Sequence, residues 1–190
     1  MKRLVYVITG AAGSGKTSVQ RYLIQKYHMS KVITHTTRAP PRQNEQDGVD
    51  YYFENPATFA QNHYLEQVQY SNNQYGSSYE GIERAWQGSS DAVIVLDTKG
   101  GAITYANQLG DQAVIIYMQV AALNELADRM EKRGDSPELI KQRLVSPENQ
   151  RDLQLPQELV GKAHVINNVD WETTKMRVDQ VVAETREIKD

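Results

Sequence analysis

Residues 10–17 read Gly10-Ala11-Ala12-Gly13-Ser14-Gly15-Lys16-Thr17 and match the pattern G-x-x-x-x-G-K-[ST] at every fixed position. An apolar run over 4–9 precedes the motif and predicts a buried strand. Residues 16–27 carry apolar side chains at helical spacing, so the motif should form a strand-to-helix turn. The backbone N–H groups of such a turn point into one concavity at the positive end of a helix. The motif therefore predicts a site for the phosphates of a nucleoside triphosphate.

Backbone and side chains of this motif have different expected roles. Lys16 would bridge the β- and γ-phosphates, and the Thr17 hydroxyl would take a position on Mg²⁺. A glycine-rich turn that binds nothing is the alternative, and the complete motif in its strand–helix setting argues against it. The predicted nucleotide-binding residues of the motif are Gly10, Ala11, Ala12, Gly13, Ser14, Gly15, Lys16 and Thr17.

Strand and helix patterns alternate along much of the remaining chain and predict an α/β fold with a parallel sheet. Helices are expected over 120–132 and after Asp170, which would cap the last helix. The side chains expected to face inward from that helix are Trp171, Val178, Val181 and Val182. Further strands are expected over 31–34, 91–97, 113–118 and 164–166.

Two segments depart from this alternation. Residues 35–80 are rich in Tyr, Asn, Gln and Pro, and they include six of the eleven tyrosines. Within them, Asn55-Pro56 supplies the N-cap and first-turn proline of a small helix. Residues 133–160 are charged and polar, with three prolines. We interpret these segments as insertions over one edge of the sheet, one a ligand-binding subdomain and the other a mobile lid.

Length and composition exclude several other kinds of protein. The 190 residues suffice for one domain with insertions, and the formal charge of −3 gives no general attraction to nucleic acid or anionic membranes. The absence of cysteine excludes disulfides, thiolate zinc sites and cysteine catalysis. The longest apolar run has about six residues, whereas a membrane-spanning helix needs ~18. We therefore expect a cytoplasmic monomer or homodimer without nucleic-acid or membrane partners.

A second motif follows the first strand–helix unit. Residues 36–53 read Thr36-Thr37-Arg38-Ala39-Pro40-Pro41-Arg42-Gln43-Asn44-Glu45-Gln46-Asp47-Gly48-Val49-Asp50-Tyr51-Tyr52-Phe53. This segment resembles the guanylate kinase signature T-T-R-x-P-R-x-G-E-x-D-G-x-D-Y-x-F, although one extra residue separates Arg38 from Arg42. The resemblance continues in order along nearly the whole chain, at Tyr64-Leu65-Glu66, Tyr75-Gly76-Ser77, Arg129-x-x-x-Arg133-Gly134, Arg143 and Val165-Ile166-Asn167.

The resemblance implies a P-loop kinase fold with a central parallel sheet flanked by helices, in a single guanylate kinase-like domain over 1–190. The implied reaction is ATP-dependent phosphorylation of GMP to GDP by in-line phosphoryl transfer, with ATP and Mg²⁺ as cofactors and GMP as the small-molecule partner. The implied parts are a core over 1–34, 81–121 and 162–190, a nucleoside monophosphate-binding subdomain over 35–80 and a lid over 122–161.

The resemblance also implies roles for single residues. Asn167 would lie near the adenine of ATP, and Glu66 would accept hydrogen bonds from the guanine of GMP. The residues that would bind the acceptor are Thr34, Arg38, Arg42, Tyr51, Glu66, Tyr75 and Ser77. The residues that would surround the transferring phosphoryl group are Lys16, Arg38, Arg129, Arg133 and Arg143.

The residue types suit these roles on chemical grounds. An arginine fork binds phosphate at two points, where lysine acts as a point charge. A carboxylate such as Glu66 suits guanine, because N1–H and the N2 amino group are adjacent donors and adenine has no such pair. Asp97 ends a strand beside the phosphate motif, so with Thr17 it is a candidate Mg²⁺ ligand, and a plain turn residue is the alternative.

Simpler interpretations of the other charges stay open. Arg38 and Arg42 would be solvated loop charges, and Glu66 an exposed charge at a sheet edge. Two of the arginines predicted to lie in the lid have possible partners on their own helix face. In that interpretation Arg129 and Arg133 would pair with Glu125 or Glu131.

Two alternative functions stay open, and the first of them is motivated by a departure at Val95, where the family usually carries an acidic residue that contributes to base recognition. One is a guanylate kinase-like kinase with a different phosphorylated acceptor. The other is a non-catalytic guanylate kinase-like module that binds proteins. Such modules typically have eroded phosphate loops, so the intact Lys16 and Thr17 argue against the second alternative.

Overall fold

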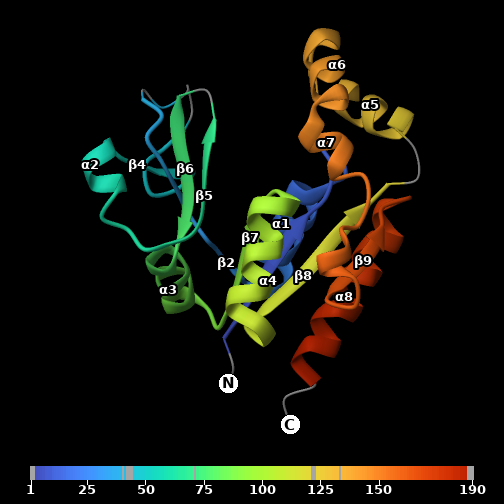
Figure 1. Cartoon of the computed structure of the whole chain (residues 1–190). Coiled ribbons are helices and arrows are strands. Elements are labelled where there is room, and N and C mark those ends of the chain that lie inside the picture. The colour runs from blue at the N-terminus through green and yellow to red at the C-terminus, as the bar shows by residue number, and fades with distance from the viewer. Residues whose placement is uncertain are drawn as a thin grey trace.

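The computed structural model describes residues 3–39, 41, 45–70, 72–120, 123–132 and 134–187. Its centre is a five-stranded sheet in the order β2-β7-β1-β8-β9, in which all neighbouring strands are parallel (Figure 1). The α/β fold with a parallel sheet, predicted from the alternating pattern, is confirmed. The strands of this sheet are β1 (Leu4–Thr9), β2 (Ser30–Lys31), β7 (Asp91–Val95), β8 (Ala113–Gln119) and β9 (Ala163–Asn167).

The side chains of β1 alternate between two apolar layers, one on each face of this sheet. Its even-numbered residues pack with helices α1 (Lys16–Tyr27) and α8 (Trp171–Glu187). Its two valines pack with α3 (Tyr79–Gly88) and α4 (Ile103–Leu109) on the opposite face. All six β1 residues are buried, so the strand that leads into the phosphate motif is held from both sides.

A second sheet of four strands, in the order β4-β3-β6-β5, stands beside the core sheet (Figure 1). Asn55 caps α2 (Pro56–Phe59) as predicted, because its side-chain oxygen accepts from the N–H groups of Ala57 and Thr58. The strands are β3 (Thr34–Thr36), β4 (Tyr51–Phe53), β5 (Tyr64–Tyr70) and β6 (Asn73–Ser78).

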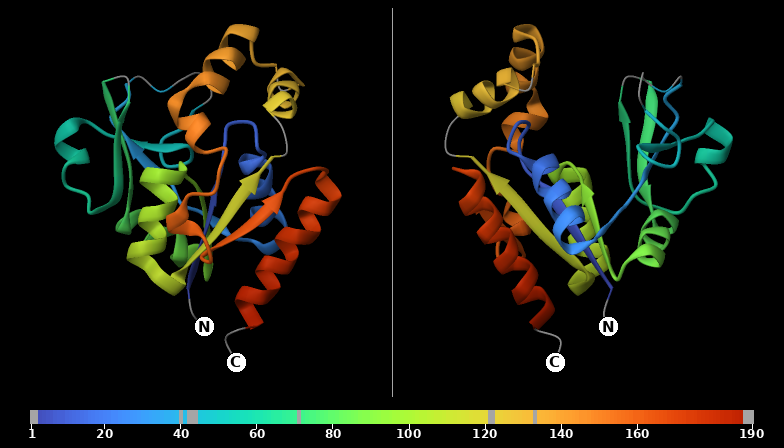
Figure 2. Two further views of the ribbon diagram at one scale, coloured as in Figure 1. Left: turned by 45° about the vertical axis from the view of Figure 1, so that its right-hand side comes forward. Right: turned by 180° about the vertical axis from the view of Figure 1, so that it is seen from behind.

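Three further helices stand over the carboxyl ends of the core strands, on the side away from the second sheet (Figure 2). They are α5 (Leu123–Lys132), α6 (Pro137–Val145) and α7 (Pro147–Arg151). Pro147 separates the last two, and Ser146 ends α6 while it caps α7. Short turns of other helix types lie at Thr98–Ala102 (π), Gly110–Gln112 and Gln157–Leu159 (both 3₁₀). Among the helices that the structure describes, none is long and apolar enough to cross a bilayer.

Several elements differ from their predicted form. The strand expected over 31–34 is two strands, β2 in the core sheet and β3 in the second sheet. Helices α3 and α4 are absent from the predicted elements. Trp171 was expected to face inward, and this is wrong: it is 39% exposed. As the first residue of α8 it meets Tyr22 of α1 edge-to-face, with ring centroids 5.7 Å apart, at the rim of a cavity above the sheet.

Candidate active site

The phosphate-binding motif forms the turn between β1 and α1. Because β1 lies between β7 and β8, this turn stands at the carboxyl ends of the central strands. Gly10 opens the turn with φ 126°, and a Cβ there would lie 2.4 Å from the carbonyl oxygen of Met118 on β8. Glycine is required at this position, since the backbone passes too close to the neighbouring strand for a side chain.

Lys16 begins α1 and reaches back over the turn that precedes it. Its Nζ donates hydrogen bonds to the carbonyl oxygens of Gly10 and Ala11, each at 2.7 Å. Thr17 follows on the same first turn of the helix and is exposed. The ammonium group therefore lies beside the N-terminus of α1. The charge of Lys16 and the positive end of the helix dipole both favour the binding of an anion there.

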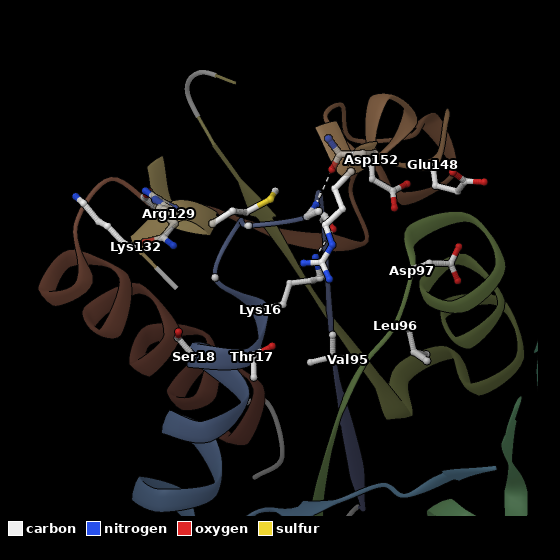
Figure 3. Close-up of a pocket in the computed structure, with 18 of the residues that line it drawn as sticks. Lys16, Thr17, Ser18, Val95, Leu96, Asp97, Arg129, Lys132, Glu148 and Asp152 are labelled. Carbon is white, nitrogen blue, oxygen red and sulfur yellow. Dashed lines mark hydrogen bonds between the residues drawn. The ribbon is translucent and has the colours of Figure 1, made fainter. Parts of the chain in front are cut away.

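The turn forms one wall of a cavity of about 1020 Å³. Figure 3 shows Lys16 near the centre of the cavity and Thr17 on the helix below it. Arg129 and Lys132 lie to one side of Lys16 (Figure 3). The acidic side chains on the other side are Asp97, Glu148 and Asp152. A cavity of this size accommodates a nucleotide, and its basic side lies next to the helix N-terminus.

The two predicted metal ligands, Thr17 and Asp97, line this same cavity. The Asp97 carboxylate accepts hydrogen bonds from Gly100 N–H at 2.9 Å and from Arg151 at 3.3 Å. No group of three or more metal-binding side chains occurs within the described ranges. A hydroxyl and one carboxylate fit Mg²⁺, because this cation takes most of its oxygen ligands from phosphates and water in such sites.

The arginines predicted on the lid side differ in what they bind. Arg129 donates from Nη2 to the carbonyl oxygen of Asn168 at 2.5 Å and lies 3.6 Å from Glu125. Its Nη1 is buried and has no hydrogen-bond partner among the described residues, as expected for a group that binds a ligand in the cavity. Arg143 also lines the cavity and pairs with Asp135 at 3.0 Å. Arg133 lies outside the described residues.

The asparagine at the cavity is one position later than predicted. Asn167, assigned from sequence to the adenine of ATP, is the exposed last residue of β9. Asn168 lines the cavity instead, and its Nδ2 donates to the carbonyl oxygen of Ser14 at 2.8 Å. Its Oδ1 accepts from Thr174 at 2.8 Å, so the amide is fixed between the phosphate turn and α8.

Arg38, Tyr51 and Tyr75 come together in the second sheet. The rings of Tyr51 and Tyr75 lie 6.2 Å apart, and the Arg38 guanidinium lies 5.7 Å from the centre of the Tyr51 ring. Arg38 donates to Glu45 at 2.6 Å, which together with a hydrogen bond to Tyr75 raises the pKa of Arg38. Its Nε is buried without a partner in the described part of the chain. Arg42 lies outside the described residues.

Glu66 and Ser77 form a neighbouring buried pair. They are opposite each other on β5 and β6, next to a β-bulge, and Ser77 Oγ donates to Glu66 Oε1 at 3.2 Å. The other oxygen, Oε2, is buried and accepts no hydrogen bond from any described residue. Burial raises the pKa of Glu66 to about 7, with a further contribution from the charge of Asp97. Thr34 begins β3, where it is paired in register with Tyr51.

The predicted residues therefore form three groups. Arg38 lies with Tyr51 and Tyr75, Glu66 pairs with Ser77, and the third group lines the cavity at the phosphate turn. The family model described as guanylate kinase matches residues 2–185. The chain belongs to the guanylate kinase family. Membership confirms the resemblance found in the sequence and makes the protein a kinase.

Curated guanylate kinases resemble the chain over most of its length. The enzyme of Thermus thermophilus is 35% identical over 153 residues, which cover 78% of this chain and 68% of that protein. The enzyme of Bacteroides fragilis is 31% identical over 187 residues, which cover 95% of this chain and 88% of that protein. The match of the family model over 2–185 includes residues 35–80 and 133–160.

Solved structures share the fold at lower identity. The guanylate kinase of Anaplasma phagocytophilum has a TM-score of 0.62 at 19% identity, with 99% of this chain and 86% of that chain covered. A gluconokinase from Sinorhizobium meliloti 1021 has a TM-score of 0.53 at 13% identity, with 98% of this chain and 95% of that chain covered. These similarities support the kinase fold alone.

Two residues of this guanylate kinase-family chain that sequence reasoning missed lie at the site. The side-chain oxygen of Asn149, which is 4% exposed on α7, accepts a hydrogen bond from Ala12 N–H of the phosphate turn at 2.7 Å. Arg151 on the same helix pairs with Asp97 at 3.3 Å and with Asp152 at 2.7 Å. The Ser146-Pro147 helix start was a usable sign of α7. The packing of α7 on the phosphate turn depends on contacts between residues that are far apart in the sequence.

Proposed function

We propose that the chain transfers the γ-phosphoryl group of ATP to GMP and so produces ADP and GDP. The observation that carries this proposal is the buried Glu66 carboxylate, whose Oε2 accepts no hydrogen bond from the described residues while Ser77 donates to Oε1. A buried acceptor without a donor is costly, by about 1–3 kcal/mol. The adjacent N1–H and N2 donors of guanine match this need, and adenine presents no such pair of donors.

The acceptor phosphate would bind at Arg38, between the hydroxyls of Tyr51 and Tyr75. The buried Nε of Arg38, which is without a partner in the described ranges, supports this assignment because a guanidinium binds phosphate through two N–H groups. Arg42 belongs to the same proposed site on the strength of the sequence motif. Thr34, at the start of the neighbouring strand β3, would help to hold the base.

Phosphoryl transfer needs alignment and positive charge more than covalent help. Lys16, Arg129 and Arg143 line the same cavity, and we propose that with Arg133 and Arg38 they surround the transferring group during in-line transfer. Thr17 and Asp97 would hold Mg²⁺, which neutralises charge on the β- and γ-phosphates when bound. Asn168 replaces Asn167 in the proposed adenine-side wall.

Domain closure is part of this proposal. The acceptor groups lie on the second sheet and the nucleotide cavity lies beside α5–α7, and we propose that these two parts approach each other during transfer. We propose that 35–80 is the acceptor subdomain, that 122–161 is the lid, and that both move on the core. Because the reaction consumes ATP, we also propose a cytoplasmic location.

The direct test is ADP release from ATP and Mg²⁺ in a coupled assay with a panel of phosphorylated acceptors. We expect turnover with GMP, weaker turnover with IMP, which lacks the N2 donor, and the weakest with AMP. Loss of one donor to Glu66 should cost IMP about tenfold in kcat/KM. Turnover with another acceptor and none with GMP would replace the proposal by the alternative-acceptor function. Absence of turnover with every acceptor would favour the protein-binding module.

The affinity for GMP should rise with pH between pH 6 and pH 8. Glu66 accepts from guanine only as a carboxylate, and burial raises its pKa to about 7. Below that pH the side chain holds a proton that must leave on binding, so Kd should be about tenfold weaker at pH 6 than at pH 8. Titration calorimetry at several pH values measures this.

Glu66→Gln is the matched control for this pH dependence. It removes the ionisation of residue 66 and keeps that of the GMP phosphate, whose second pKa is near 6. The variant should bind GMP more weakly and with a flatter profile than the wild type. Identical pH profiles for the two proteins would contradict the role of Glu66.

A further inference from the structure

The phosphate turn is held from outside by a buried asparagine of α7. Asn149 accepts a hydrogen bond at its Oδ1 from Ala12 N–H, at 2.7 Å, and is buried. Its Nδ2 donates to the carbonyl oxygen of Leu144 at 3.4 Å. Both ends of the amide therefore have partners, as buried polar groups require, and the shorter of the two contacts is the one to the turn. The Ala12 N–H is thus committed to a side chain from 137 positions away.

The contact from Asn149 fixes the tightest part of the turn. Ser14 N–H donates to the carbonyl oxygen of Ala11 at 3.2 Å, so residues 11–14 form a β-turn. Gly13 is the third residue of this β-turn and has φ 79°, a positive value like that at the same position of type II turns. Ala12 is its second residue, and Asn149 holds the N–H of that residue in place. The shape of the turn decides where the N–H groups farther along it point, and those groups would bind phosphate.

Helix α7 is itself fastened to the core, so Asn149 reaches the turn from a fixed position. The Tyr117 hydroxyl of β8 donates to the carbonyl oxygen of Asp152, directly after α7, at 2.7 Å, and both residues are buried. Arg151, the last residue of α7, pairs with Asp97 after the end of β7 at 3.3 Å. Strands β7 and β8 are the two neighbours of β1, which leads into the turn. The end of α7 is therefore tied to both sides of that strand.

Asparagine suits this position because it is a neutral acceptor. A leucine of similar volume would leave the Ala12 N–H without the oxygen that it now meets at 2.7 Å. An aspartate would keep an acceptor there, but it would add a negative charge to a cavity that already has Asp97, Glu148 and Asp152 on one side. Such a charge would repel the phosphates of a nucleotide. The amide of Asn149 therefore holds the turn without this repulsion.

We propose that Asn149 is a positioning residue for the phosphates of the donor nucleotide: its Oδ1 holds the Ala12 N–H, so that the turn has its phosphate-binding shape before the nucleotide arrives. The inference rests on the proposed function, and it keeps α7 on the core when the rest of the proposed lid moves. A turn that is ordered beforehand loses less conformational freedom on binding. Asn149 therefore increases the affinity for ATP through the turn and not through a contact of its own with the nucleotide.

Asn149→Ala removes the acceptor and adds no charge, so it is the principal test. Without nucleotide, hydrogen exchange at Ala12 N–H, followed by ¹⁵N NMR, should be at least about tenfold faster than in the wild type. The Kd for MgATP should rise about three- to tenfold, as expected for the loss of one neutral hydrogen bond, and the Kd for GMP should stay within about twofold. Unchanged exchange at Ala12 or unchanged MgATP affinity would overturn the proposal. Tighter binding of MgATP would also overturn it, because Asn149 would then compete with phosphate for the turn.

Gln150→Ala is the matched control. Gln150 is the next residue of α7, its side chain is exposed, and its Nε2 donates to the same carbonyl oxygen of Leu144, at 2.6 Å. The variant loses an amide from α7 and keeps the acceptor at Ala12, so exchange at Ala12 and the Kd for MgATP should both stay within about twofold of the wild type. A loss of MgATP affinity equal to that in Asn149→Ala would mean that α7 acts only through its stability, and would overturn the role of Asn149.

Asn149→Asp separates the hydrogen bond from the charge, and it keeps the test decisive if Asn149→Ala folds poorly. The carboxylate keeps an acceptor for the Ala12 N–H, so exchange there should stay as slow as in the wild type. MgATP affinity should fall at low salt, and the difference from the wild type should shrink at high salt, which screens the added charge. Fast exchange at Ala12, or an MgATP affinity equal to that of the wild type at low salt, would overturn the proposal.

These measurements distinguish the inference from the proposed function. The exchange experiment needs no nucleotide, and MgATP binding needs no acceptor. A wild type that binds MgATP and phosphorylates no acceptor would count against the proposed function alone. A wild type that phosphorylates GMP, with an Asn149→Ala variant of equal MgATP affinity, would count against the inference alone. A wild type that binds no MgATP would overturn both.

Discussion

Replacing Lys16 with alanine is expected to reduce phosphoryl transfer by a factor on the order of 10³ while GMP binding stays within about twofold. The Lys16 ammonium lies at the helix N-terminus, 2.7 Å from two carbonyl oxygens of the phosphate turn, at the centre of the cavity. Its charge would act on the β- and γ-phosphates as negative charge redistributes between them. The acceptor groups Arg38 and Glu66 lie on the second sheet, so their contacts do not depend on it. Single-turnover kinetics and GMP calorimetry separate the two effects.

The control for this prediction is Lys26→Ala, at the other end of the same helix. Lys26 pairs with Asp179 of α8 at 2.7 Å and lies far from the motif in α1. This variant tests the loss of a positive charge from α1 without loss of the phosphate contact, and its turnover should stay within about twofold of the wild type. Lys16→Arg should remain strongly impaired, because a planar guanidinium cannot occupy the place of a compact ammonium group. Loss of GMP binding in Lys16→Ala would place the acceptor, not ATP, at the phosphate turn.

The parts of the fold that sequence predicts best are those fixed by local signals. The strand and helix around the phosphate motif begin and end where their patterns indicate, because an apolar run, a glycine turn and a helical period all agree there. The parallel core sheet follows from the alternation of strands and helices. The apolar pattern over 31–34 does not show that the chain changes sheets at this point, since β2 and β3 are both short and belong to different sheets.

The residues that sequence reasoning missed depend on contacts between remote segments. Asn149 meets Ala12 across 137 positions, and Arg151 reaches Asp97 across 54. No spacing rule relates such pairs, so a motif search does not find them. The motif likewise does not show that Asn168 lines the cavity, because Asn167 and Asn168 follow one another at the end of β9. Arg38 and Tyr51 of the proposed acceptor site were easier to find, since both lie within the motif at 36–53.

The second large effect is expected for Arg38→Ala, which should weaken GMP binding by about 2 kcal/mol, or about thirtyfold in Kd. The Arg38 side chain is largely buried against the rings of Tyr51 and Phe53 and pairs with Glu45 at 2.6 Å. The stacked rings hold the planar guanidinium in one orientation, and its buried Nε is without a partner in the part of the chain that the structure describes. A phosphate in this place would receive two hydrogen bonds without much further ordering of the side chain. GMP affinity measured by calorimetry should therefore fall, and ATP affinity should not.

Two variants decide whether the geometry of Arg38 or only its charge matters. Arg38→Lys keeps the charge and loses the planar fork, so it should recover about half of the lost binding free energy. Arg84→Ala removes a guanidinium that stacks on Tyr52 at 4.5 Å, next to the second sheet but outside the proposed site, and should leave GMP affinity within about twofold. Full recovery in Arg38→Lys would reduce the role of Arg38 to a general attraction, which salt would then screen. An equal loss in Arg84→Ala would mean that the second sheet contributes its net charge, and that the acceptor phosphate is not held at Arg38.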